Sequence, residues 1–126
     1  INGEMPFYVL SADTLSTFNK MSSANAVKDG HHLIDTIIVP VIRLDTMLEK
    51  YSNNQNIDFM SIDVEGFEIQ VLMSNDWNKF RPKFLIVEIN QNGRAIKNYI
   101  YSLGYLSVFD NGTNCIFEDK QAPFEL

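Results

Sequence analysis

The stretch IDFMSIDVEGFEIQVL (residues 57–72) carries three carboxylates before its glycine, within and at the end of an apolar run. Asp58 is near its start, and Asp63 and Glu65 are near its centre. Gly66 follows at once, and the residues after it have the spacing of a helix. A positioned carboxylate is a common general base, and charges are rarely placed in a buried strand. Whether these carboxylates can act as bases depends on the strands and helices that position them.

A second group of polar residues ends the next apolar run, residues 84–89, which is typical of a buried strand. Glu88 and Asn90 lie at its end, as Asp63 and Glu65 lie at the end of the first. In an open α/β sheet, ligands bind outside the carboxyl ends of the strands. We therefore expect these four residues to share one rim, which makes them candidate site residues.

Two simpler interpretations remain open. Glu65 and Glu68 precede or begin a helix, where a carboxylate is favoured by the helix dipole. Glu88 has no helix start beside it to cap, so an ion pair is its alternative role. Three arginines are candidates for that pair: Arg43, Arg81 and Arg94. Asp58 belongs at the opposite rim and is expected to be solvated.

The apolar patterns predict further elements around this centre. Strands are expected at residues 7–10, 37–42, 57–64, 84–89, 105–109 and 115–117. Helices are expected from residue 44, over 67–73 and around residues 96–103. Continuous apolar strands that alternate with helices predict an α/β fold with a mostly parallel sheet, covered on both faces, and a C-terminal antiparallel hairpin.

Local signals refine this assignment. Pro40 favours an edge strand, Asp45 an N-cap, and Gly104 a helix C-terminus. Residues 11–32 are rich in Ser, Asn, Lys and Asp, which predicts a long loop with at most a helical turn around residues 14–21. A loop of this length in a small domain is usually functional or mobile.

Length and composition limit the number of domains and the kinds of partner that the chain can bind. The 126 residues predict a single domain, 1–126, and the net charge of −6 gives no basic face for a nucleic acid. No apolar run is long enough to span a membrane. One cysteine, Cys115, excludes an internal disulfide and fits a reducing, cytoplasmic location. His31 and His32 have no third ligand at metal spacing, so no metal site is expected.

Four segments together resemble the FkbM-type S-adenosylmethionine-dependent methyltransferases. The stretch at residues 57–72 is similar to the family pattern I-D-x-L-K-I-D-V-E-G-x-E-x-x-V-L. VPVIRLDTMLEKY before it, and RPKFLIVEIN and LGY after it, extend the resemblance over about residues 40–109. The resemblance implies a Rossmann-like methyltransferase fold, with residues 57–64 as its fourth strand and 84–89 as its fifth.

That resemblance also implies a reaction. The expected chemistry is methyl transfer from S-adenosylmethionine to a hydroxyl of a sugar or secondary metabolite, so the partner is a small-molecule or glycan acceptor. Asp63 corresponds to the tip of the fourth strand, near the sulfonium methyl group. Asp63 and Glu65 are then candidates for base and orienting group, and Glu88 and Asn90 line the acceptor side.

The sequence departs from the family in two places. Ser61 replaces the usual Lys before Ile-Asp-Val. The family's Gly-rich turn and ribose-binding acid are also missing, because none of the six glycines forms a G-x-G pair. We therefore expect the chain to be the C-terminal portion of a methyltransferase, inactive by itself.

Two other functions compete with methyl transfer. Asp58, Asp63 and Glu65 partly match the D-x-x-D-x-D-x-E strand of chitinase-type glycosidases, but Ser61 replaces one acid and that barrel needs about 250 residues. The other alternative is a non-catalytic α/β module that binds a partner or glycan. An open sheet edge in such a module would favour a homodimer.

Overall fold

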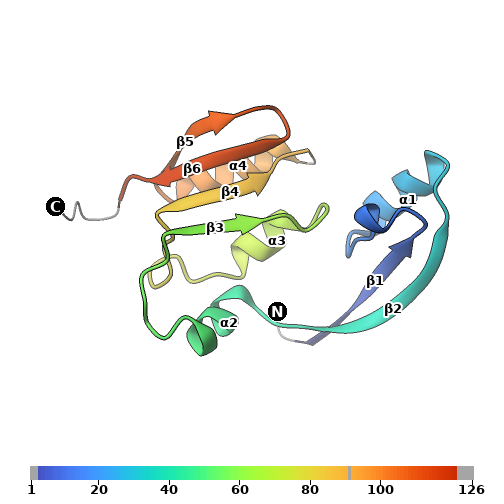
Figure 1. Cartoon of the computed structure of the whole chain (residues 1–126), viewed down its shortest axis with the longest axis horizontal. Coiled ribbons are helices and arrows are strands. Elements are labelled where there is room, and N and C mark those ends of the chain that lie inside the picture. Colours follow the sequence, from blue (N-terminus) through green and yellow to red (C-terminus); the bar gives the residue numbers. More distant parts are fainter. Residues whose placement is uncertain (1–2, 91, 122–126) are drawn as a thin grey trace.

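The computed structural model describes residues 3–90 and 92–121, which form two β-sheets and the helices that connect their strands (Figure 1). The elements in chain order are β1 (Gly3–Leu10), the 3-10 turn η1 (Asp13–Leu15), α1 (Lys20–Lys28), β2 (Leu33–Val41), α2 (Leu44–Tyr51), β3 (Phe59–Ile62), α3 (Glu68–Met73), β4 (Phe84–Glu88), α4 (Gly93–Ser102), β5 (Tyr105–Asp110) and β6 (Asn114–Asp119). The fold is mixed α/β, as the patterns predicted.

The larger sheet has the strand order β3-β4-β6-β5. Only β3 and β4 are parallel, because α3 forms a crossover between them. The turn between β5 and β6 is too short for a crossover, so this hairpin is antiparallel, and β6 is also antiparallel to β4. The prediction of a mostly parallel sheet is therefore wrong for the described residues, whereas the C-terminal hairpin is confirmed.

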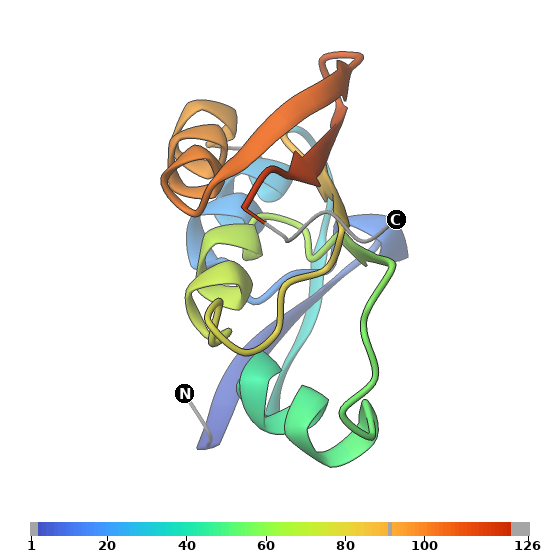
Figure 2. The same ribbon diagram turned by 90° about the vertical axis from the view of Figure 1, so that its left-hand side faces the viewer.

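Helices α3 and α4 cover the same face of this sheet. In Figure 1 both lie behind the strands, and in Figure 2, turned by 90°, both lie to one side. Alternating strand residues on that side are fully buried, namely Leu85, Val87, Cys115 and Phe117. On the other face Phe59 is 64% exposed and Leu106 is 54% exposed. The prediction of helices on both faces is therefore wrong within the described part of the chain.

The N-terminal strands form their own antiparallel ribbon instead of joining the larger sheet. β2 pairs with β1 alone among the described strands, so Pro40 lies in an edge strand as predicted. The prediction that residues 11–32 form a long loop is wrong, because α1 occupies Lys20–Lys28. This helix buries only Ser23 and Ala26, so its sequence lacks an apolar stripe.

Helix ends agree in part with the predictions. Gly104 follows the end of α4 with φ +91°, as a C-terminal glycine should. Asp45 is not an N-cap: Arg43 occupies that position and pairs with Asp45 at 2.9 Å.

Within the residues described, no helix combines the length and apolar character needed to cross a membrane.

Candidate active site

Asp63 and Glu88 are brought together by the register of the two parallel strands. Ile62 pairs with Val87, and each acid comes one residue later. Because side chains alternate across a strand and both paired residues are buried in the core, the acids lie on the uncovered face. Asp63 is exposed and Glu88 is half-buried. The predicted shared rim is therefore present.

Glu65 completes a cluster of three carboxylates. One oxygen each of Asp63, Glu65 and Glu88 can be chosen so that all three lie within 4.8 Å of one another. Among the described residues this is the group of acidic, His or Cys side chains close enough together to hold a metal ion, although exposed acids often cluster without one. His31 and His32 are not part of it, and we assign no metal.

The surroundings of Glu88 raise its pKa to about 7. The largest cause is a hydrogen bond that its carboxyl group shares with Asp63, followed by partial burial and the charge of Glu65. Asn90 acts in the opposite direction, because its Nδ2 donates a hydrogen bond to Glu88 Oε1 at 2.7 Å. Glu88 therefore exchanges its proton near neutral pH.

Burial also raises the pKa of Glu65, and the charges of Asp63 and Glu68 add to the effect. The backbone of Glu65 has φ +46°, the left-handed region that residues with a side chain rarely adopt. This conformation turns the chain sharply between β3 and α3. It also keeps the Glu65 carboxylate at the strand ends.

The hydrogen bonds at the start of α3 show which of the nearby acids stabilises the helix start. Helix α3 has Phe67 as its N-cap and no side-chain cap, so Glu65 does not cap it. Glu68 is 3% exposed and accepts hydrogen bonds from the N–H groups of Val64 (3.2 Å) and Gly66 (3.4 Å). Glu68 therefore has the local structural role.

The proposed ion pairs to Glu88 are also resolved. Arg43 pairs with Asp45, and Arg81 pairs with Asp119 at 2.7 Å. No ion pair to Glu88 occurs among the residues that the structure describes. Its nearest polar partners are therefore other acids and one amide.

The family model of the methyltransferase FkbM domain matches residues 3–107. The chain belongs to the FkbM methyltransferase family. The acid cluster therefore lies in a domain of methyltransferase type. Searches of curated proteins and of solved structures give no significant match.

The FkbM match begins well before the segments that carried the resemblance, so it includes the polar residues 11–32. Within them, Thr17 donates a hydrogen bond to the carbonyl of Glu65, and Asn19 Nδ2 donates one to the carbonyl of Gly66 at 3.0 Å. Sequence analysis missed both residues. Ser, Thr and Asn are common in any polar loop, and contacts across 47 or 48 positions leave no local pattern.

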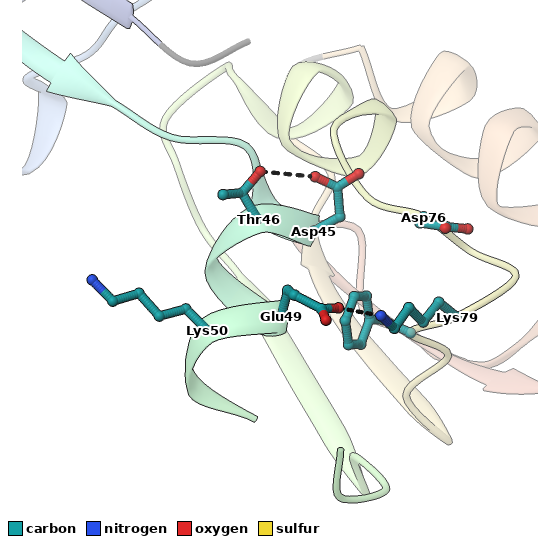
Figure 3. Close-up of a pocket in the computed structure, with 7 residues that line it drawn as sticks. Asp45, Thr46, Glu49, Lys50, Asp76 and Lys79 are labelled. Carbon is teal, nitrogen blue, oxygen red and sulfur yellow. Dashed lines mark hydrogen bonds and ion pairs between the residues drawn. The ribbon is translucent and has the colours of Figure 1, made fainter. Parts of the chain in front are cut away.

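Two hollows in the surface of this FkbM domain lie away from the acid cluster. A hollow of about 380 Å³ beside α2 is shown in Figure 3, where Glu49 pairs with Lys79. Its lining is Asp45, Thr46, Glu49, Lys50, Asp76, Lys79 and Phe80. A second hollow of about 450 Å³ lies against α4. None of the three clustered acids lines either, and Asp58 is exposed near the start of β3.

Proposed function

We propose that the chain takes part in S-adenosylmethionine-dependent methyl transfer to a hydroxyl oxygen of a small molecule or glycan. The single observation that supports this best is the gathering of Asp63, Glu65 and Glu88 at the ends of parallel strands. Membership of the FkbM family supplies the reaction class. An acceptor hydroxyl must lose its proton as its oxygen is methylated, so a nearby base is useful.

Glu88 is the best candidate for that base. Its pKa of about 7 lets it be ionised yet hold a proton near neutral pH. In this role a Glu88 oxygen takes the hydroxyl proton, which then lies in the hydrogen bond shared with Asp63. Asn90 helps to orient the carboxyl group through the hydrogen bond that it donates to Oε1. The sequence had assigned the base to Asp63 or Glu65, and the pKa favours Glu88 instead.

The cofactor, when bound, supplies an electrophilic methyl group on a positively charged sulfonium. The acid cluster fits that charge, and Asp63, the most exposed of the three, is the candidate to face it. The chain has no Gly-rich turn to hold the remainder of the cofactor. We therefore propose that its affinity for S-adenosylmethionine is weak.

Exchange of Glu88 tests the proposed function. Wild type and Glu88→Gln are incubated with millimolar S-adenosylmethionine and a panel of sugars and hydroxylated metabolites, and release of S-adenosylhomocysteine is measured. We expect Glu88→Gln to lower kcat by about 10²- to 10⁴-fold, the usual contribution of a general base. Asp58→Asn, at the opposite end of the strand, is the matched control and should retain activity. Equal and measurable rates for wild type and Glu88→Gln would refute the role of Glu88, whereas no release by wild type at any cofactor concentration would refute methyl transfer by this chain.

A second function is favoured by the uncovered sheet. β3 has no partner on its outer side among the described strands, and Phe59 on it is 64% exposed. A non-catalytic module that dimerises or binds a partner through this sheet is the alternative. One defined dimer in sedimentation, without release of S-adenosylhomocysteine at any cofactor concentration, would favour it.

The single thiol, Cys115, is buried and free, and we propose a cytoplasmic location on that basis.

A further inference from the structure

The segment Thr17–Asn19 contacts the loop that carries Glu65. Thr17 is 1% exposed, and its hydroxyl donates to the Glu65 carbonyl while accepting from the Asn19 N–H at 2.9 Å. Phe18 packs between two other rings, with centroid distances of 4.8 Å to Phe7 and 5.8 Å to Phe67. Polar and aromatic contacts therefore join this segment to the loop.

The segment is itself anchored to β1. The backbone of Thr17 exchanges two hydrogen bonds with Tyr8, at 2.8 Å and 3.1 Å. Asn19 is the N-cap of α1, where its Oδ1 accepts from the Ser22 N–H at 3.0 Å. Thr17 is thus bridged to β1, and Asn19 begins α1, so both donors to the loop are anchored to the N-terminal elements.

The peptide that follows Glu65 is held at both ends. Its carbonyl accepts from Thr17, and its N–H, on Gly66, donates to the carboxylate of Glu68. A left-handed backbone at a residue with a side chain costs about 1 kcal/mol or more and persists only where its surroundings impose it. These hydrogen bonds impose it at Glu65, where φ is +46°.

We propose that Thr17 and Asn19 are positioning residues that hold the carboxylate of Glu65 against Asp63 and Glu88. Without their hydrogen bonds the loop relaxes toward an ordinary backbone conformation, and the Glu65 side chain leaves the cluster. The consequence for catalysis rests on the proposed function, but the geometric consequence does not.

The test compares Thr17→Val with Thr17→Ser. Valine has nearly the shape of threonine but cannot donate, whereas serine keeps the hydroxyl. The carboxyl carbons of the glutamates are titrated by NMR, and kcat and KM are measured under the conditions given above. We expect Thr17→Val to lower the pKa of Glu88 by about half a unit or more, since the charge of Glu65 moves away.

Activity provides the second measurement. Thr17→Val should lower kcat at least about tenfold with little change in KM, because positioning acts on the reacting geometry. Thr17→Ser should restore both the titration and kcat. Thr14→Val, an exposed threonine in η1, controls for loss of a hydroxyl and should change neither.

If Thr17→Val does not fold, Asn19→Asp replaces it. Aspartate keeps the oxygen that caps α1 but loses the Nδ2 donor to the Gly66 carbonyl. If Glu88 titrates as in wild type in a folded Thr17→Val or Asn19→Asp, the positioning role is overturned, even in an active methyltransferase. A shifted titration in a protein that transfers no methyl group would support positioning while refuting the proposed function.

Discussion

Asp63 and Glu88 lie at the ends of adjacent parallel strands, one residue beyond the Ile62–Val87 pair, with carboxylate oxygens within 4.8 Å of each other. The backbone register of the two strands places both residues at the same rim of the sheet. Two carboxylates at this distance do not both ionise easily. The strand pairing therefore creates a group that exchanges a proton near neutral pH.

Under the proposed mechanism, the rate of methyl transfer should depend on the ionisation of Glu88. Only the carboxylate accepts a proton, and its pKa is about 7. Below that pH, kcat should fall about tenfold per unit, as for a single essential base. Measurement of kcat against pH checks this. A rate that stays constant through neutral pH into the acid range would contradict it.

The raised pKa of Glu88 also predicts how stability depends on pH. The folded chain binds this proton more tightly than the unfolded chain, whose pKa is near 4.5. Stability is then fully present below 4.5 and is lost as pH rises through about 7. Glu88→Gln removes this loss and should be more stable than wild type by about 1 kcal/mol above pH 7, since solvent screens a half-buried group. Urea denaturation of wild type and Glu88→Gln, below pH 4.5 and above pH 7, checks this. Equal stability of the two proteins above pH 7 would contradict it.

Asp119 and Arg81 form an ion pair that should matter for stability. The side chain of Asp119 is inaccessible to solvent, and it accepts from Arg81 at 2.7 Å and 3.0 Å. Asp119→Ala leaves the guanidinium without this partner and should cost about 3 kcal/mol. Glu49→Ala breaks an exposed pair with Lys79 and should cost less than about 1 kcal/mol. Thermal unfolding of both variants checks the contrast, and equal costs would contradict it.

Cofactor affinity is predicted to be weak. The sequence has no G-x-G pair, so the adenosine portion has no Gly-rich turn to approach. Isothermal calorimetry of the 126-residue chain with S-adenosylmethionine should show no binding below millimolar concentration. Binding in the micromolar range would show that other residues hold the cofactor.

Local patterns predicted the elements around the cluster well. The runs that became β3 and β4 are apolar and lead into acids, and the residues between them form α3, so their parallel pairing followed from general rules of α/β folds. Helix α1 was missed for a physical reason. It buries only small side chains, and Asn19 starts it with a cap that is common in loops as well.

The sequence by itself determined that Asp63, Glu65 and Glu88 lie at or just after the ends of apolar strands in a methyltransferase-type domain. Only the tertiary structure decided that the sheet is mostly antiparallel and covered on one face, because strand order depends on pairings between distant segments. It also decided that Glu88 titrates near neutral pH and that Thr17 reaches Glu65. Both effects require groups far apart in the chain to meet in space, which no local pattern records.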